Sequence, residues 1–301
     1  MVTIILLAGG ESQRLWPFTG GEDAKQFLPL FNGESMLQRT YRKIARQPFV
    51  EEILVSTNLK QVSAVKKQLP SALSLCEPYY QGTHAALLLA LAFLKEERSL
   101  QEGDLVGIIP IDSEAEANYF DAIGAMAQKA KEGIVLMGIE PRKPTSRFGY
   151  ILSDSDNRVE RFVEKPPEEE AERLIAQGAL WNGGIALFPL GLFPVPSYSD
   201  LLDDYSSQPP LSFDQAVLEK STYPRFVHPY RGEWDDLGSW PSLLKVVGDK
   251  NFGPHTIQGE GTNTTVLNFT SSPLNLVEPQ DLLVAMSPKG SLVVHKKHLK
   301  G

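Results

Sequence analysis

Four apolar, β-branched segments with helical patterns between them constrain this chain more than any other feature. They span residues Val2–Ala8, Ile53–Thr57, Leu105–Ile109 and Ile134–Ile139. Short apolar runs in this arrangement are typical of buried parallel strands joined by helical crossovers. We therefore predict an α/β fold with an open sheet flanked by helices.

Helix starts can be placed between these strands. Ser35 can cap one helix, Thr83 can cap a second, and Asn118 can begin a third. In open sheets of this kind, ligands bind beyond the carboxyl ends of the strands. We therefore expect the chemistry in the loops that follow Ala8 and Ile109.

After Glu140 the alternation of apolar strands and helices gives way to a different pattern. A two-strand segment is expected across Tyr150–Val163 and an acidic helix across Glu168–Ala176. A second break near residues 248–254 precedes a segment rich in Thr, Asn, Gly and Val, which favours a small β-rich tail. The sequence predicts two domains, residues 1–249 and residues 250–301.

Composition limits the classes of binding partner that we expect and indicates a cellular compartment. The 301 residues include 29 Lys and Arg against 37 Asp and Glu, a net charge of -8 that argues against nucleic-acid or anionic-membrane binding. The single cysteine, Cys76, excludes an intrachain disulfide and fits a reducing compartment. No apolar run reaches the roughly 18 residues that span a bilayer. We expect an unprocessed, soluble, cytoplasmic protein with no nucleic-acid or membrane partner.

The first apolar run ends in a pattern suited to phosphate binding. Gly9 and Gly10 let the backbone approach an anion, and Arg14 and Lys25 follow with the positive charge that phosphate oxygens require. The alternative is an ordinary tight turn after a strand, which the glycines alone would favour.

Two carboxylates far apart in sequence are candidate metal ligands. Asp112 follows the strand that ends at Ile109, and Asp236 lies in the segment from Glu233 to Trp240. If they converge, they could hold Mg²⁺, which takes oxygen ligands and leaves positions for water and substrate phosphates. The alternative for each is a turn or helix-cap residue.

Two further motifs are candidate sugar-phosphate contacts. Glu164 and Lys165 place an acceptor beside a cation at the end of a predicted strand, and Trp181 is followed by Asn182-Gly183-Gly184. Taken alone, the first is more simply a solvated ion pair and the second a turn with a core aromatic.

Together, these signals resemble the sugar-phosphate nucleotidyltransferases, most closely the bacterial mannose-1-phosphate guanylyltransferases, from about Val2 to Val247. The landmarks occur in the order of that family. They are Leu7-Ala8-Gly9-Gly10 with Arg14-Leu15-Trp16-Pro17, Lys25-Gln26-Phe27, Glu77-Pro78 with Gly82-Thr83, Pro110-Ile111-Asp112, Phe162-Val163-Glu164-Lys165-Pro166, Trp181-Asn182-Gly183-Gly184 and Trp234-Asp235-Asp236-Leu237-Gly238-Ser239-Trp240.

This resemblance implies a fold of the nucleotide-diphospho-sugar transferase type, with a Rossmann-like mixed, mostly parallel sheet. It implies that residues 1–249 are a nucleotidyltransferase domain. The implied reaction is Mg²⁺-assisted in-line transfer of GMP from GTP to mannose 1-phosphate, giving GDP-mannose and pyrophosphate. Related enzymes are commonly dimers, so a homodimer is expected.

The resemblance also implies roles for individual residues. Arg14 and Lys25 would be catalytic, and Asp112 and Asp236 would hold Mg²⁺. The implied nucleotide-binding residues are Leu7, Ala8, Gly9, Gly10, Gly82 and Thr83. The implied sugar-phosphate-binding residues are Gly149, Glu164, Lys165 and Asn182.

Four positions depart from the family pattern. Ser12 stands where a glycine is usual, Ala24 replaces a proline, Ser113 replaces a histidine, and Gly183 stands where a serine is common. Two alternatives are open, of which the second is consistent with the changes at Ser12, Ala24 and Ser113. One is a nucleotidyltransferase that uses another base or sugar, and the other is a non-catalytic regulatory subunit that binds nucleotide sugar.

Overall fold

The computed structural model describes residues 1–116, 118–220 and 222–299. The chain divides into two compact units. Unit 1 comprises Met1–Gly9, Thr40–Ile111 and Ala115–Trp234, and unit 2 comprises Gly10–Arg39, Asp112–Glu114 and Asp235–Gly301. The domain boundary expected between residues 249 and 250 stays a prediction, and the last two residues of its second domain lie outside the described part.

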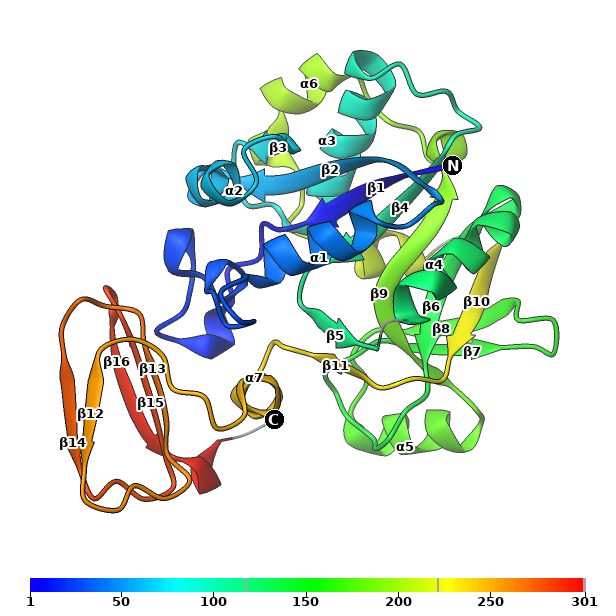
Figure 1. Cartoon of the computed structure of the whole chain (residues 1–301). Helices are drawn as coiled ribbons and strands as arrows, with labels where there is room; N and C mark the ends of the chain where they lie inside the picture. Colours follow the sequence, from blue (N-terminus) through cyan, green and yellow to red (C-terminus); the bar gives the residue numbers. More distant parts are fainter. Residues whose placement is uncertain (117, 221, 300–301) are drawn as a thin grey trace. The chain divides into compact units, whose positions relative to one another are not determined.

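Unit 1 is built on one nine-stranded sheet (Figure 1). Its main path runs β10-β6-β9-β4-β1-β2-β3, with the hairpin of β7 and β8 joined through β9. The strands are β1 (Val2–Leu7), β2 (Val50–Asn58), β3 (Leu73–Glu77), β4 (Leu105–Pro110), β6 (Ile134–Ile139), β7 (Tyr150–Ser153), β8 (Val159–Val163), β9 (Leu180–Pro189) and β10 (Arg225–Tyr230).

The sheet is mixed and largely parallel. β1 pairs in parallel with β2 and β4, β2 with β3, and β10 with β6, whereas β9 runs antiparallel to β4 and β6. The four predicted strands are confirmed, and so is the predicted mixed α/β fold class. Continuous apolar runs arise here because β1 is buried on both faces of the sheet.

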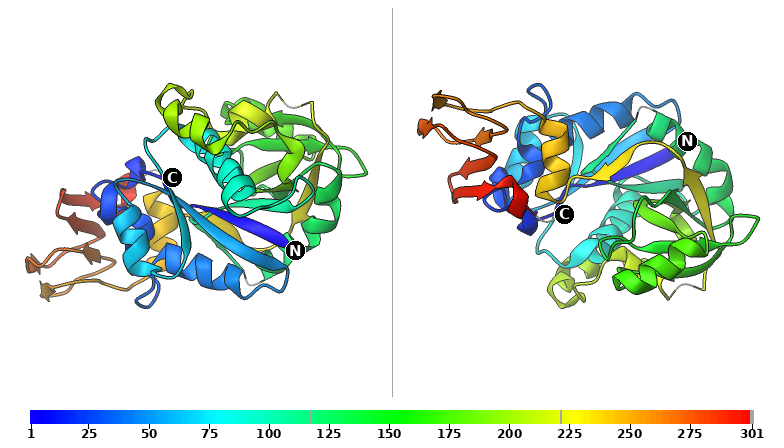
Figure 2. Two further views of the ribbon diagram at one scale, coloured as in Figure 1. Left: turned by 90° about the horizontal axis from the view of Figure 1, so that it is seen from above. Right: turned by 90° about the horizontal axis from the view of Figure 1, so that it is seen from below.

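The helices of unit 1 cover this sheet. They include α2 (Val62–Gln68), α3 (Gly82–Glu97), α4 (Asn118–Lys129), α5 (Glu168–Ala176) and α6 (Tyr198–Asp203), while α1 (Met36–Ala45) begins in unit 2. The apolar residues of α3 extend around the helix because it packs against β1–β3 on one side and α6 on another (Figure 2).

Two predicted helix starts are confirmed, and one is wrong. Ser35 caps α1, since its hydroxyl accepts a hydrogen bond from the Gln38 N–H at 3.1 Å, and α4 begins at Asn118. Thr83 does not cap α3, because the helix already begins at Gly82 and the Thr83 hydroxyl accepts from the Phe213 N–H at 2.9 Å. A tertiary contact has replaced the local cap.

Unit 2 has its own apolar core and the predicted β-rich tail. Its elements are α7 (Trp240–Val247), the parallel pair β12 (His255–Gln258) and β14 (Leu274–Val277), and the three-stranded sheet of β13 (Thr265–Asn268), β15 (Leu282–Ser287) and β16 (Gly290–His295). Two short strands, β5 (Ser113–Ala115) and β11 (Trp234–Asp236), pair with each other at the unit boundaries.

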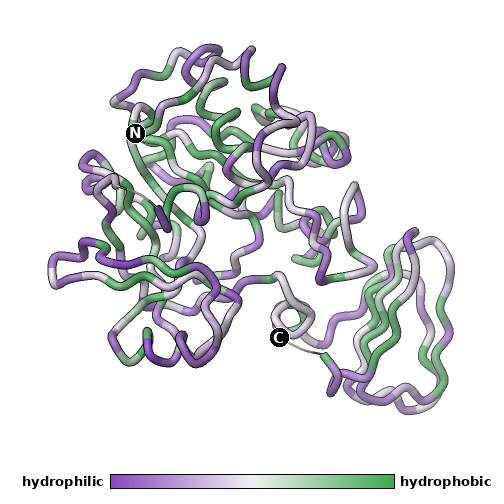
Figure 3. Tube along the Cα trace, turned by 180° about the vertical axis from the view of Figure 1, so that it is seen from behind, coloured by the Kyte–Doolittle hydropathy of each residue, from purple (hydrophilic) through white to green (hydrophobic). Residues whose placement is uncertain are grey.

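Many of the strands are apolar, and many of the turns between them are hydrophilic (Figure 3). Among the described residues, no helix is long and apolar enough to cross a membrane.

Candidate active site

Lys25 is a buried cation of unit 2 that pairs with one of the predicted metal ligands. It begins a 3₁₀ turn and is only 5% exposed. Its ammonium donates to Asp112 Oδ2 at 2.8 Å and to the Leu237 carbonyl at 3.0 Å. Burial raises the pKa of Asp112, but the charge and hydrogen bond of Lys25 outweigh it and hold that pKa below its ordinary value. Asp112 is therefore ionised at neutral pH.

Arg14 and Asp236 form a second pair of opposite charges. Arg14 Nη2 lies 3.8 Å from Asp236 Oδ2, and the Arg14 side chain is 63% exposed. Asp236 Oδ1 accepts from the Gly238 N–H at 2.9 Å, which holds the carboxylate against its own turn. The exposed Arg14 guanidinium is therefore accessible to an anionic ligand.

The two predicted metal ligands lie on neighbouring backbone segments. The Leu237 N–H donates to the Asp112 carbonyl at 2.9 Å, and β5 pairs with β11. The four predicted catalytic and metal-binding residues, Arg14, Lys25, Asp112 and Asp236, thus all lie in unit 2, where they form two pairs of opposite charge.

The chemistry of this pair suits a hard cation. The Asp112 and Asp236 side chains offer carboxylate oxygens and keep 34% and 18% of their surface exposed. Mg²⁺ commonly takes one or two carboxylates and completes its shell with water and substrate phosphates. Across the described ranges, no group of three or more His, Cys, Asp or Glu could hold a metal ion.

The loop before Lys25 is fixed by Gln26. Its amide donates to the Gly10 carbonyl at 2.7 Å, and its Oε1 accepts from the Ser12 hydroxyl at 3.0 Å. Ser12 has φ 53°, the left-handed conformation that a glycine would adopt at lower cost. The hydroxyl bond to Gln26 is the local compensation for a serine at this position.

In unit 1, a side chain approaches Gly9 closely. Its carbonyl accepts from Asn58 Nδ2 at 2.9 Å, and a Cβ at Gly9 would lie 2.8 Å from Glu77 Oε1. Leu7 ends β1, and the Ala8 N–H donates to the Ser56 carbonyl at 2.8 Å. These three predicted nucleotide-binding residues therefore lie at the carboxyl edge of the sheet, beside Glu77.

Glu77 is a buried acid to which sequence reasoning assigned no role. It ends β3, is 3% exposed, and accepts a hydrogen bond from the Tyr205 hydroxyl at 2.8 Å. Burial raises its pKa to about 7, although the Tyr205 hydrogen bond acts in the opposite direction. Its place beside Pro78 in a family landmark was the only sequence signal.

The predicted sugar-phosphate residues also converge in unit 1. The Asn182 N–H donates to the Gly149 carbonyl at 2.7 Å, and a Cβ at Gly149 would lie 2.7 Å from Glu164 Oε2. Glu164 Oε1 is 2.7 Å from Lys165 Nζ. Gly149 follows Phe148, which packs against Trp181 and Trp234, so an aromatic cluster fixes this turn.

Asp214 and Glu219 are further residues that sequence reasoning missed. Asn182 Nδ2 donates to Asp214 Oδ1 at 2.6 Å, and the Glu164 N–H donates to Glu219 Oε1 at 3.2 Å. Burial and the nearby Glu164 raise the pKa of Asp214 to about 6. No sequence motif indicates these two acids, because their contacts depend on the conformation of the helical turn that follows Ser212.

Gly82 and Thr83, the remaining predicted nucleotide-binding residues, begin α3. They meet the same segment, since Thr83 accepts from the N–H of Phe213, the residue before Asp214. Contacts inside unit 1 thus connect the predicted nucleotide side, through Phe213 and Asp214, to Asn182 on the predicted sugar side.

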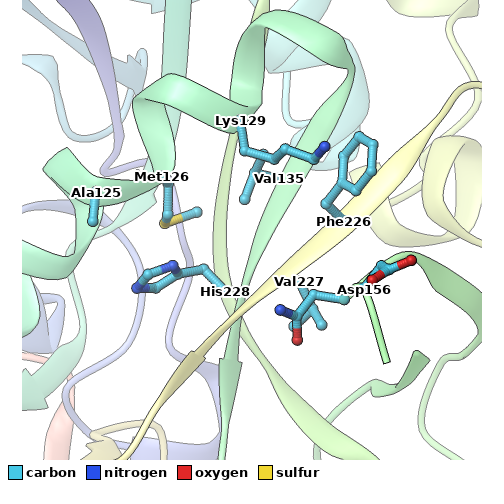
Figure 4. Close-up of a pocket in the computed structure, with 9 residues that line it drawn as sticks. Ala125, Met126, Lys129, Val135, Asp156, Phe226, Val227 and His228 are labelled. Carbon is cyan, nitrogen blue, oxygen red and sulfur yellow. The ribbon is translucent and has the colours of Figure 1, made fainter. Parts of the chain in front are cut away.

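A separate pocket of about 180 Å³ lies elsewhere in unit 1 (Figure 4). Its lining comes from α4, β6, β10 and the turn at Asp156 and Asn157, and includes none of the predicted site residues. Its Lys129 ammonium lies 4.1 Å from the Phe226 ring centroid and 2.6 Å from Glu132. This lysine therefore already has an acidic and an aromatic partner.

The chain is similar in sequence and architecture to known proteins. The sequence pattern of the nucleotidyl transferase family matches residues 3–251. The xanthan biosynthesis protein XanB of Xanthomonas campestris pv. campestris is 32% identical, over 98% of this chain and 70% of XanB. A mannose-1-phosphate guanylyltransferase of Klebsiella pneumoniae is 31% identical, over 99% of this chain and 69% of that protein.

A solved structure gives the same result. The crystal structure of mannose-1-phosphate geranyltransferase from Thermus thermophilus superposes with a TM-score of 0.78 at 28% identity, covering 98% of this chain and 95% of that one. The family match spans most of the sheet, both carboxylates and the loop that carries Lys25. The resemblance noted in the sequence is confirmed, and this chain belongs to the nucleotidyl transferase family.

Proposed function

We propose that this protein transfers a nucleoside monophosphate from a nucleoside triphosphate to a sugar 1-phosphate and releases pyrophosphate. The observation that carries the proposal is the buried Lys25 ammonium, held between the Asp112 carboxylate and the Leu237 carbonyl. A buried cation fixed beside an ionised carboxylate suits the alignment of phosphates, and the family match supports the reaction class.

The reaction needs no protein nucleophile. An oxygen of the sugar phosphate attacks the α-phosphorus, one P–O bond forms, and the bond to the departing pyrophosphate breaks in line with it. In this proposal the exposed Arg14 guanidinium stabilises charge on the triphosphate, and Lys25 aligns the reacting phosphates. Leu7, Ala8, Gly9, Gly10, Gly82 and Thr83 contribute to the nucleotide site.

Asp112 and Asp236 would hold Mg²⁺ in this proposal. When bound, the ion would neutralise phosphate charge that Arg14 and Lys25 balance only in part. Lys25 keeps Asp112 ionised and therefore ready to accept a cation. The Arg14 guanidinium lies 3.8 Å from the Asp236 carboxylate, so its positive charge is next to the second proposed ligand.

The sugar side is assigned to Gly149, Glu164, Lys165 and Asn182. The Glu164 side chain is only 9% exposed, whereas Lys165 is 60% exposed and available to a phosphate. A carboxylate and an amide can hydrogen-bond sugar hydroxyls, while the lysine supplies charge.

For the substrates, we propose GTP and mannose 1-phosphate, with GDP-mannose as the product. The support is the guanylyltransferase among the relatives and the Trp16, Lys25-Gln26-Phe27 and Trp234–Trp240 features of the sequence. We also propose cytoplasmic localisation, for which the single cysteine is the support, and a homodimer, for which exposed Val277 and Val293 on the β-rich tail offer a surface.

The test is pyrophosphate release with Mg²⁺. Mannose 1-phosphate or glucose 1-phosphate is paired with each of GTP, ATP, dTTP, UTP and CTP. Preferential turnover of GTP with mannose 1-phosphate is expected. Preference for another pair would support the same reaction class with a different base or sugar. No turnover by folded protein with any pair would favour a regulatory subunit that binds nucleotide sugar.

A further inference from the structure

The segment from Asp214 to Leu218 is a single π-helical turn. Its defining bond runs from the Glu219 N–H to the Asp214 carbonyl, at 2.9 Å and five residues apart. Such turns are uncommon in proteins and often occur at functional sites, because they bring side chains five residues apart onto one side of the helix. Here the two side chains so placed are both acids.

Asp214 determines how the amide of Asn182 is oriented. An ionised carboxylate only accepts hydrogen bonds, so the 2.6 Å contact assigns the donating NH₂ group of Asn182 to Asp214. The other end of the amide, Oδ1, accepts from the Gly184 N–H at 3.1 Å. Both ends of the Asn182 amide are therefore held, and the side chain has one defined orientation.

Glu219 acts on the neighbouring sugar-side residue. Its Oε1 accepts from the Glu164 N–H at 3.2 Å and so holds the main chain of the residue whose side chain lies close to Gly149 and pairs with Lys165. Asp214 and Glu219 thus reach two different members of the predicted sugar-phosphate set from one turn. In an α-helix, residues five apart would point in different directions.

We propose that this π-helical turn is a positioning element for the sugar side of the site, in which Asp214 orients Asn182 and Glu219 holds the backbone of Glu164. The inference rests on the proposed function, since it takes Asn182 and Glu164 as the residues that contact the sugar. Neither acid is assigned a direct role in the chemistry.

The test compares Asp214→Ala with Asp214→Asn. The alanine variant leaves the Asn182 NH₂ group without its acceptor, so KM for the sugar 1-phosphate should rise about tenfold while KM for the nucleoside triphosphate stays within about twofold. Asparagine can still accept through its own Oδ1, so Asp214→Asn should retain a KM within about twofold of wild type. Exposed Asp203 provides a matched control, Asp203→Ala, with both KM values unchanged.

Calorimetric titration separates this inference from the proposed function. GDP-mannose and GTP are titrated into wild type and both variants, and Asp214→Ala should weaken only GDP-mannose binding. Wild type that binds GDP-mannose without turnover would overturn the proposed reaction, while the Asp214→Ala comparison would still decide the positioning role. The inference is overturned if wild type does not bind GDP-mannose, if Asp214→Ala leaves its binding intact, or if binding of both ligands weakens equally.

Discussion

At the residue scale, the pair of Lys25 and Asp112 is predicted to serve both stability and turnover. Lys25→Met leaves Asp112 without its partner and should lower the free energy of unfolding by about 2 kcal/mol, less than for a fully buried pair because the Asp112 side chain is 34% exposed. Asp112→Asn removes a proposed metal ligand and should lower kcat by about a hundredfold or more. Chemical denaturation and pyrophosphate release measure the two effects.

A double variant separates these two roles of the pair. In Lys25→Met/Asp112→Asn no unpaired charge remains, so much of the lost stability should return while activity stays low. Asp236→Asn is the companion test of the second carboxylate. Near-normal activity in both single Asp→Asn variants, with unchanged magnesium dependence, would refute the metal assignment.

Glu77 gives a prediction about pH. Its pKa is raised from 4.5 to about 7 in the folded chain, so between these values the unfolded chain has lost a proton that the folded chain retains. The free energy of unfolding should therefore fall as pH rises through this window, by up to about 3 kcal/mol for this residue. In Glu77→Gln that part of the pH dependence should be absent.

The measurement is denaturant unfolding of wild type and Glu77→Gln from about pH 4.5 to about pH 8, which brackets the two pKa values. The difference between the two proteins isolates Glu77 from Asp214, whose pKa is also raised. Glutamine can still accept from the Tyr205 hydroxyl, so the contact itself is preserved. Parallel stability curves for the two proteins would contradict the prediction.

At the element scale, the sequence correctly predicted those helices and strands whose structure is determined by local residues and not by distant contacts. The acidic helix across Glu168–Ala176 and the strands within Tyr150–Val163 form where hydrophobic pattern and helix signals agree. The cap at Thr83 was wrong because its hydroxyl bonds to Phe213, which is 130 residues away. The π-helical turn carried no local signal, since the extra residue per turn depends on its packing.

At the scale of the whole molecule, motifs predicted the charged residues of the candidate site but not the contacts that support them. Arg14, Lys25, Asp112 and Asp236 could be chosen from residue type and order, and the structure places them in one unit. Asp214 was missed, and the supporting contacts of Gln26 were not predicted although it lies in a family landmark, because a supporting contact leaves no spacing pattern. The ligand roles of all these residues stay predictions.

The β-rich tail shares a core with the loop that carries Lys25. Leu267, Leu283 and Ala285 of the tail belong to one buried cluster with Leu15, Phe18, Leu28 and Leu30. The Ser287 hydroxyl also donates to the Pro17 carbonyl at 2.9 Å. A change in the tail should therefore disturb the loop even though the tail contains no predicted site residue.

Leu283→Ala should lower the free energy of unfolding by about 3 kcal/mol, since Leu283 is fully buried and alanine leaves a cavity. It should also lower kcat at a temperature where the variant is still folded, because Lys25 sits in the loop that this core supports. Thr256→Ala is the control, since Thr256 is an exposed residue of the tail and its loss should change neither quantity appreciably. A folded chain of residues 1–249 with normal turnover would show instead that the tail is an independent domain, as the predicted division into two domains implies.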